Sequence, residues 1–457
     1  MAFPTPPFKI SRKVSEADAD LLAYLRTDGN VSYLRPETLT EVQELKEADL
    51  QAKSGALLKL WPMILTDALY RLKEHDPREW NKATKDVDYG SFFHEGSLGV
   101  RELRETLESF TKFESMLYGA SPDRYRDHIA HAFRVWITGH AILREQQCFG
   151  GKLFADSEFN GDKVKGSESR QPEILPDEWE CMWAIAALCH DLGYPLSQLD
   201  TINSRARDAL EQMGLVHAGD LRFSFSPQML PFQDTIIRLM ASKPVAVEKR
   251  YTTHLQNKYY LKLLKSFDDL KHGIVSSLLV SKALVYFLES DLSQDRTDNL
   301  TVEDARQFLI RREILRAIAW HTCQDIYHLR FDTLSFLLYM VDEIQCWGRP
   351  TLEELQHQAT SVPEAEAEVI AFGANKCRVI IRTGSKAWSE EDRKGVEAQI
   401  SKLHRMLRLG VGTSMLKGRE MEFAVVRDDG NGMRLILDGG RISVEKVAAG
   451  AAHGLAR

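Results

Sequence analysis

The stretch "AIAALCHDLGYPLS", residues 184–197, places a run of small and apolar residues directly before His190 and Asp191. The apolar run predicts a buried helix that ends near residue 191. A carboxylate and an imidazole at the end of such a helix cost free energy unless they have partners. Those partners are either hydrogen-bonding groups of the core or a metal ion, and the dipeptide by itself favours neither.

The composition is that of a globular protein with a substantial core. The chain has 457 residues, of which 44% are hydrophobic and 27% charged, and this length predicts two to three domains. The net charge of -7 excludes a globally basic nucleic-acid binder, although a local basic patch remains compatible with it.

No segment approaches the ~18 apolar residues of a membrane span, and the N-terminal residues lack the apolar region of a secretory signal. The six cysteines form no CxxC pair. Together these features predict a cytoplasmic protein with reduced thiols and no membrane contact.

The spacing of apolar residues predicts a mainly α protein with three regions. Residues 1–105 are expected to form an N-terminal helical extension, and residues 106–350 a helical domain. Residues 375–457 are expected to form a small α+β domain, because "KCRVIIRT" suggests a strand and the turn "DGNG" separates two β-rich runs. The acidic segment 352–368 is interpreted as a linker or helix, and "SPQMLPFQD", residues 226–234, as a loop.

Histidines and aspartates interrupt five apolar helical stretches of the middle region. The stretches are "HIAHAFRVWITGHAIL", "ALCHDLGYP", "KHGIVSSLLVSKAL", "ILRAIAWHT" and "FLLYMVDEIQCW". Imidazole and carboxylate groups are the usual protein ligands of Mn, Fe, Co, Ni and Zn. The pattern therefore predicts a divalent transition-metal site with up to two ions, whose candidate ligands are His131, His190, Asp191, His272, His321 and Asp342.

These five stretches, in this order, resemble the HD-domain metal-dependent phosphohydrolase superfamily over about residues 123–350. "HAFRV" resembles the first-histidine helix of the family, and "HDLGYP" resembles its H-D-x-G-x-P signature. The next two histidines are similar to those of the binuclear branch, and "DEIQCWGR" resembles the last helix of a bacterial HD branch. The resemblance implies an all-α HD domain. It also implies one ion on His131, His190, Asp191 and Asp342, and a second ion on His272 and His321 with Asp191 as the bridge.

The resemblance implies hydrolysis of a nucleotide or phosphodiester by metal-bound hydroxide, with Asp191 and His190 as the catalytic residues. Candidate substrate contacts are Lys271, Tyr194 and Arg134, although a lysine is often simply solvated and Arg134 has a buried acid as its alternative partner. Tyr194 stands where many triphosphohydrolases carry histidine and the cyclic-dinucleotide branch carries lysine, which argues against a cyclic-dinucleotide substrate. A nucleic-acid substrate and a homo-oligomer are both compatible with this interpretation.

Two other functions are compatible with the same ligands. One is a non-catalytic metal-containing ligand sensor that binds a partner, and the other is a di-iron HD oxygenase. Three further histidines are predicted to lie outside the ligand set. His128 shares a helix face with His131 and is expected beside the metal site, although His128 could instead be the metal ligand in place of His131. The second HD dipeptide, at residues 75 and 76, is expected to be an inert surface turn, and His140 is expected to lie in the core or a loop.

Overall fold

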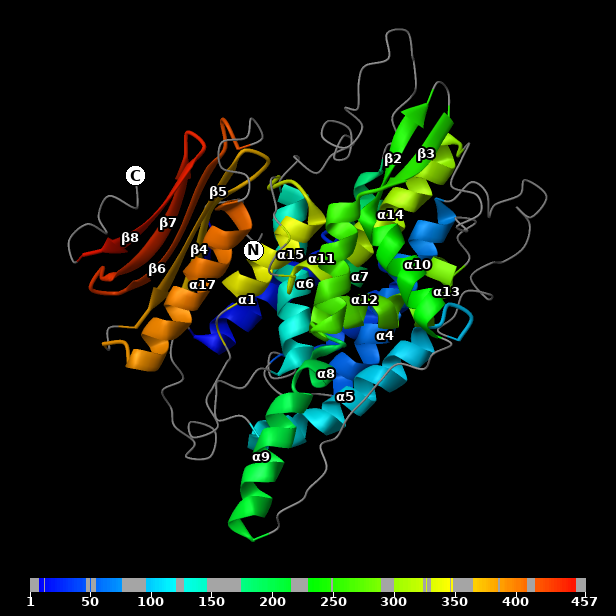
Figure 1. The fold of residues 1–457 in the computed structure, drawn as a ribbon. Helices are drawn as coiled ribbons and strands as arrows, with labels where there is room; N and C mark the ends of the chain where they lie inside the picture. The colour runs from blue at the N-terminus through cyan, green and yellow to red at the C-terminus, as the bar shows by residue number, and fades with distance from the viewer. Residues whose placement is uncertain are drawn as a thin grey trace.

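The computed structural model describes most of the chain and is mainly helical, with a sheet formed largely by the C-terminal residues (Figure 1). The residues it describes are 8–11, 13–46, 50, 55–75, 96–120, 127–145, 174–214, 229–247, 250–288, 300–323, 326, 330–345, 347, 365–384, 387–408 and 416–448. The expected fold class, a helical protein with a C-terminal α+β region, is confirmed at this level. None of the described helices is both long and apolar enough to cross a bilayer.

The N-terminal helices share a hydrophobic core with the middle region. They are α1 (Val14–Arg26), α2 (Pro36–Glu44), α4 (Gly55–Glu74) and α5 (Val100–Ala120). Their buried side chains belong to the same cluster as those of the later helices. The indole of Trp61 on α4, for example, donates a hydrogen bond of 3.0 Å to the carbonyl of Leu188. The N-terminal helices therefore help to fix the position of the segment that carries His190 and Asp191.

Helix α7 (Pro176–Cys189) lies in the middle of the helical region (Figure 1). Residues 178–189 are all buried, so this helix is enclosed by protein on every side. It begins with a proline at its first position, followed by Asp177 and Glu178, whose charges suit the positive end of the helix dipole. The neighbouring helices are α6 (His128–Glu145), α12 (His272–Ala283), α14 (Val302–Trp320) and α15 (Leu334–Ile344). All five lie in stretches where the sequence predicts helices.

The middle region also contains a β-hairpin, so the expectation of an all-α domain is wrong. Strand β2 (Ser242–Val247) pairs antiparallel with β3 (Arg250–Leu255). Tyr251 of β3 is buried with Leu300 and Ala305, which gives the hairpin an apolar cluster of its own. The hairpin follows α10 (Leu230–Ala241), whose start lies inside the segment expected to be a loop. The other helices among the described residues are α8 (Tyr194–Ser197), α9 (Leu199–Gln212), α11 (Asn257–Asp268) and α13 (Val285–Leu288).

Six strands form the second sheet, in the order β1-β4-β5-β6-β7-β8. They are β1 (Phe8–Ile10), β4 (Ala365–Phe372), β5 (Lys376–Thr383), β6 (Glu420–Arg427), β7 (Gly432–Asp438) and β8 (Arg441–Val447). Only β5 and β6 are parallel, and α17 (Glu390–Arg408) connects them. The predicted strand at "KCRVIIRT" and the "DGNG" hairpin are confirmed as β5 and β6–β7. Residues 365–368 belong to β4, which corrects their interpretation as linker or helix.

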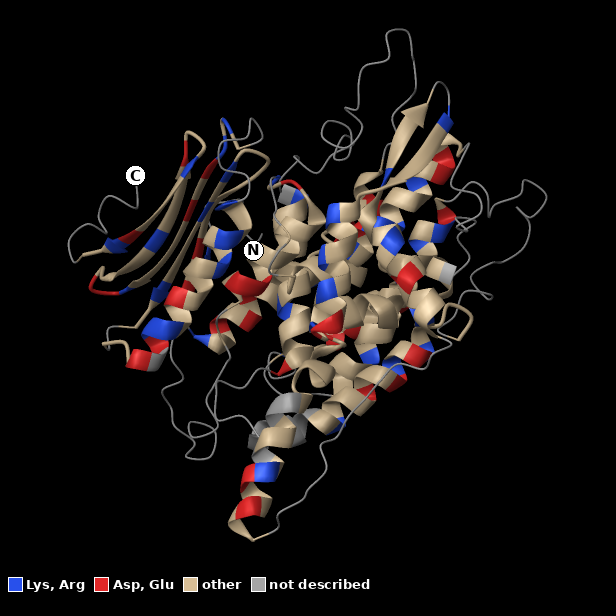
Figure 2. Ribbon diagram, in the orientation of Figure 1, with Lys and Arg blue, Asp and Glu red and all other residues tan. Residues whose placement is uncertain are grey.

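The two faces of this sheet differ in character. Side chains such as Phe423 and Leu435 pack into the main core together with Leu403 of α17. Residues in alternate positions point to the other face, where positive and negative side chains pair across neighbouring strands. Figure 2 marks the positively and negatively charged residues along these strands. Arg378 lies opposite Glu422 at 2.5 Å, and two strands further on Arg434 binds Glu445 at 2.8 Å. The cross-strand pairs fix the register of β5–β6 and of β7–β8 on the side away from α17.

Candidate metal centre

All six candidate ligands meet in the helical region. His131 lies on α6, His190 and Asp191 follow α7, and His272 begins α12. His321 follows α14, and Asp342 lies on α15. Two overlapping triads have ligand atoms within 4.8 Å of one another, one with His131, His190 and Asp342 and the other with His190, Asp191 and His321. These buried triads form a donor set that can bind metal ions.

The two oxygens of Asp191 face two different pairs of imidazoles. Its Oδ2 lies 3.2 Å from Nε2 of His190 and 3.6 Å from Nε2 of His131. Its Oδ1 lies 3.2 Å from Nε2 of His272 and 3.6 Å from Nε2 of His321. This is the arrangement that a carboxylate between two cations requires.

Asp342 completes the first of the two groups. Its Oδ1 lies 3.2 Å from Nε2 of His131. The first group thus contains two imidazoles and two carboxylates, and the second contains His272, His321 and the other oxygen of Asp191. One of the two triads, His190, Asp191 and His321, takes a histidine from each group, so the two groups form one continuous cluster.

The hydrogen bonds on the far side of three imidazoles fix which nitrogen faces the cluster. Nδ1 of His190 lies 2.7 Å from the carbonyl of Ala187, and Nδ1 of His321 lies 2.6 Å from the carbonyl of Ile318. A carbonyl only accepts, so each Nδ1 carries the hydrogen and each neutral ring points the lone pair of Nε2 into the cluster. His131 is held in the same way by a side-chain oxygen.

These tautomers make a cation fit the site. Nε2 of His131 and Nε2 of His190 lie 3.2 Å apart. Two lone pairs at this distance repel each other unless a proton or a metal ion lies between them. Ligand histidines typically donate their other nitrogen to a carbonyl or carboxylate, as these three do. The chemistry of the donor set therefore suits transition-metal ions.

The pKa shifts of Asp191 and His321 favour the protonation states that metal ligands need, whereas the shift of His190 favours a protonated ring in the absence of a metal ion. Burial by itself would raise the pKa of Asp191, but the charge of His190 and the hydrogen bonds from His190, His272 and His321 lower it well below its usual value. Burial lowers the pKa of His321 to about 4. Burial is the largest single influence on His190 and acts to lower its pKa, but the charges of Asp191 and Asp342, together with the hydrogen bonds to Asp191 and to the carbonyl of Ala187, outweigh it and raise the pKa. Near pH 7, Asp191 is therefore ionised and His321 is neutral.

Two glycines allow the ligand-bearing segments to approach each other. A Cβ atom on Gly193 would lie 2.5 Å from the carbonyl oxygen of His272, and one on Gly273 would lie 2.5 Å from the carbonyl oxygen of Ile318. Real side chains do not tolerate such contacts. The backbone of Gly273 also donates a hydrogen bond of 3.1 Å to the hydroxyl of Thr322, next to His321. Gly193 thus sets the spacing between the HD turn and α12, and Gly273 sets the spacing between α12 and α14.

The substitution Gly273→Ala is expected to weaken the second ion and to spare the first. The added methyl group pushes α12 away from α14, which separates His272 from His321 but leaves His131, His190 and Asp342 in place. We expect the affinity for the second ion to fall about 10–100-fold, as measured by metal titration of the chelator-treated protein.

The control for this experiment is Gly395→Ala on α17, where an added Cβ meets nothing within 4 Å. It should bind two ions like the wild type. Equal binding of both ions by Gly273→Ala would show that this contact does not set the ligand spacing.

One side of the centre is more open than the rest. The side chains of His272 and Asp342 are 22% and 13% exposed, whereas those of the other four candidate ligands are at most 6% exposed. The half-buried ring of Tyr194 lies 5.4 Å from the ring of His272, and the ring of His128 lies 4.2 Å from that of Tyr194. The cluster is therefore most exposed beside His272, next to the rings of Tyr194 and His128, which we call the aromatic wall.

The other predicted residues fall into different environments. His128 lies beside the cluster through its contact with Tyr194, but it belongs to neither ligand triad. Lys271 is half-buried at the N-cap of α12, directly before His272. Arg134 is buried, and its guanidinium donates to both oxygens of Asp18 at 2.8 and 2.7 Å. This is the pairing with an acid that the sequence left open, so Arg134 is corrected from a substrate contact to a structural residue.

His140 lies in the core, which is one of the two positions, core or loop, that the sequence predicted for it. It is fully buried, and its Nδ1 lies 2.9 Å from the hydroxyl of Tyr24 on α1. Its Nε2 lies 3.5 Å from a carboxylate oxygen of Glu180. These contacts connect α1, α6 and α7 and leave His140 outside the two ligand triads.

The HD dipeptide at residues 75 and 76 does not contribute its histidine to the cluster. His75 follows α4 directly, and its Nε2 lies 2.8 Å from Oδ2 of Asp177. Arg71 donates a bond of 2.7 Å to the same oxygen. Residue 76 lies outside the described residues. The position of His75 therefore supports a structural contact between α4 and α7.

We expect His75→Ala to leave the metal content unchanged and to lower the free energy of unfolding by about 1 kcal/mol or less. The effect is small because the contact is partly exposed and Arg71 still holds Asp177. Elemental analysis and urea unfolding test the two parts separately. A loss of metal from this variant would mean that the N-terminal helices contribute a ligand.

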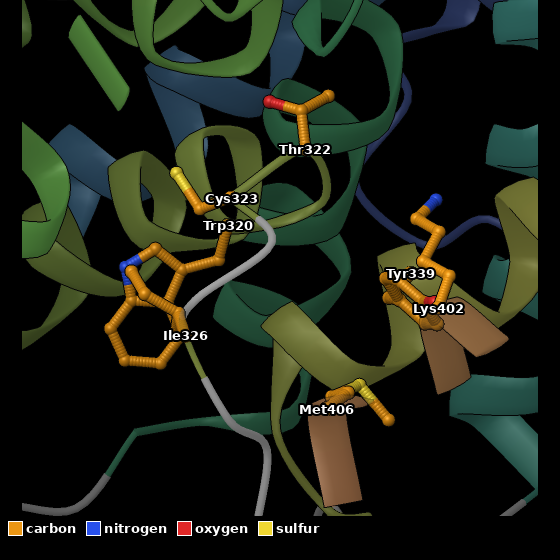
Figure 3. A pocket seen from close by; sticks show the side chains of 7 residues that line it. All are labelled: Trp320, Thr322, Cys323, Ile326, Tyr339, Lys402 and Met406. Atoms are coloured by element: carbon orange, nitrogen blue, oxygen red, sulfur yellow. The ribbon is translucent and has the colours of Figure 1, made fainter. Parts of the chain in front are cut away.

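A small crevice lies where α15 and α17 meet the residues at and after the end of α14 (Figure 3). It is lined by residues of α15 and α17 and by the end of α14, among them Trp320 and Lys402, and no candidate ligand lines it. Lys402 and Gln399 of α17 bind the two carboxylate oxygens of Glu343 at 2.6 and 2.8 Å. Because Glu343 follows Asp342, α17 is anchored one residue away from a candidate ligand.

Sequence reasoning missed several residues that shape the centre. Gly273 is one of them, and its position directly after His272 was the available signal. Gln345 is another, since it lies three residues after Asp342 and binds His131.

Compared with protein-family models, with curated proteins and with solved structures, the chain matches none of them. Any function must therefore be argued from the geometry of the centre itself.

Proposed function

We propose that the protein is a divalent-metal-dependent phosphohydrolase of the HD type that acts on a nucleotide or another phosphodiester. The observation that carries this proposal is the position of Asp191, whose two oxygens face two separate pairs of imidazoles. Two ions held in this way activate a water molecule near neutral pH and stabilise the charge that develops on a phosphoryl group.

The residues of the chain supply positioning and charge. The buried His131 and His190, together with the partly exposed Asp342, would hold one ion, and His272 and His321 would hold the other. The open side lies at the N-terminus of α12, where the helix dipole favours an anion. Lys271 at this N-cap would add positive charge beside a bound phosphate.

The aromatic wall supports a substrate with a planar group. Tyr194 is half-buried next to His272, and Phe110 contacts His128 behind it at a ring distance of 5.1 Å. A nucleobase can stack on such a surface while its phosphate reaches the open side of the centre. Nucleotides and single-stranded nucleic-acid ends are therefore the first substrates to test.

The test is a hydrolysis panel with manganese-loaded protein. Nucleotides, cyclic nucleotides and single-stranded oligonucleotides are incubated with the wild type, and the products are separated by chromatography. We expect metal-dependent hydrolysis of at least one class and none after treatment with a chelator. Failure on every phosphoester with two ions bound would contradict the proposal. Oxygen consumption by the iron-loaded protein would then favour the di-iron oxygenase, and inactivity in both assays would favour the ligand sensor.

A further inference from the structure

The outer nitrogen of His131 is held by a side chain. Its Nδ1 lies 2.6 Å from Oε1 of Gln345, and both residues are only 1% exposed. Gln345 follows α15 directly, three residues after Asp342. One short segment therefore provides a candidate ligand and also the partner of a second candidate ligand.

The amide of Gln345 has a fixed orientation. Its Nε2 donates a hydrogen bond of 2.6 Å to the backbone carbonyl of Trp347. If the amide of Gln345 were rotated by 180°, its oxygen would face the carbonyl oxygen of Trp347, and its NH₂ group would face the N–H of His131. Both contacts would then be repulsive. Gln345 therefore presents its oxygen to His131, which places the hydrogen on Nδ1 and the lone pair on Nε2.

The contacts continue from Trp347 to the N-terminal helix α1. The indole N–H of Trp347 lies 3.3 Å from Oδ1 of Asp18, and Asp18 accepts two hydrogen bonds from Arg134. Asp18 and Trp347 are at most 1% exposed. Arg134 lies on α6, three residues after His131, so the series of contacts starts and ends on the same helix.

His131 differs in this respect from His190 and His321. Those two rings donate to backbone carbonyls three residues earlier in the chain, at Ala187 and Ile318. A side-chain substitution at those positions leaves the acceptor in place. For His131, in contrast, the acceptor can be removed by changing one residue.

We propose that Gln345 is a positioning residue that fixes the tautomer and ring orientation of His131, and that Trp347 and Asp18 hold Gln345 in place. This inference rests on the proposed metal centre. Partners of this kind contribute about 10–100-fold to metal affinity. Because the amide is neutral, it orients His131 without adding another negative charge to a centre that already contains Asp191 and Asp342.

The test compares metal binding by the wild type, Gln345→Leu and a matched control. Leucine fills a similar volume but accepts no hydrogen bond, so we expect about 10–100-fold weaker binding of one ion and a changed absorption spectrum of bound Co²⁺. The control is Gln307→Leu on α14, where a fully buried glutamine binds Arg311 and Tyr286 away from the ligands. It should lower the melting temperature of the metal-free protein without changing the affinity or the spectrum.

A second variant separates the hydrogen bond from packing. Gln345→Glu keeps an oxygen that accepts the N–H of His131, so it should bind the ion more tightly than Gln345→Leu. Binding by Gln345→Leu within about threefold of the wild type would overturn the role of Gln345 and leave the metal centre standing. Equal losses in the leucine and glutamate variants would also overturn it. If the wild type itself binds no ion, the metal centre is wrong and this inference fails with it.

Discussion

Replacing Asp191 by alanine is expected to remove both metal ions from the protein. The wild type should carry two ions per chain, because Asp191 presents one oxygen to His131 and His190 and the other to His272 and His321. Without the carboxylate of Asp191, the remaining candidate ligands are four imidazoles and Asp342. Asp342 would then be the one negatively charged candidate ligand for two dications. Buried cations need compensating charge, so both sites should lose their ions. Elemental analysis after extensive dialysis measures the effect.

The matched control is Asp332→Ala. Asp332 is also a buried carboxylate, but it binds Arg330 at 2.9 Å and lies outside the ligand triads. This variant should retain both ions, and circular dichroism should show that each variant remains folded. Full metal occupancy in folded Asp191→Ala would disprove the assignment of the centre.

The second large effect is expected for turnover in His321→Ala. His131, His190, Asp191 and Asp342 hold one ion without His321, so this variant should keep one ion and lose the other. The proposed reaction needs two ions to share the activation of water and the stabilisation of charge. We therefore expect kcat to fall about 10³-fold, which corresponds to about 4 kcal/mol of activation free energy.

A matched histidine variant is available for comparison. His254 is an exposed residue of β3, and His254→Ala should leave both metal content and turnover unchanged. The two-metal mechanism is wrong if His321→Ala turns over as fast as the wild type. Loss of both ions from His321→Ala would instead show that the two groups of ligands do not bind independently.

The clustering of the candidate ligands could be anticipated because each one lies within or at the end of an apolar helix. In the stretches around His131, His321 and Asp342, the neighbouring residues are buried, and a polar side chain there requires a reason. Helical periodicity located these helices, since long amphipathic or apolar segments carry a strong local signal. The division of these residues between two ions came only from the resemblance, and it stays a prediction, because the triad of His190, Asp191 and His321 takes a histidine from each group.

The partners of these residues could not be predicted, because they are far away in the sequence. Arg134 is paired with Asp18, which lies 116 residues earlier, and Gln345 contacts His131 across 214 residues. No local pattern reports such contacts. The hairpin β2–β3 was missed for a related reason, since its stability depends on the burial of Tyr251 against Leu300, and strand preferences depend on such tertiary packing.

The pairing of β1 with β4 has a consequence for how the protein is made. Phe8 lies opposite Val369, so the edge of the sheet joins residues that leave the ribosome at opposite ends of translation. The helices that carry His131 to Asp342 are all synthesised between these two strands. Contacts among these helices can form before β1 has a partner, because β1 can pair with β4 only after β4 has been synthesised. The pairing of β1 with β4 is therefore expected to be a late step of folding. Until then β1 lacks its neighbour, and the nascent chain is exposed to strand pairing with other copies during this interval.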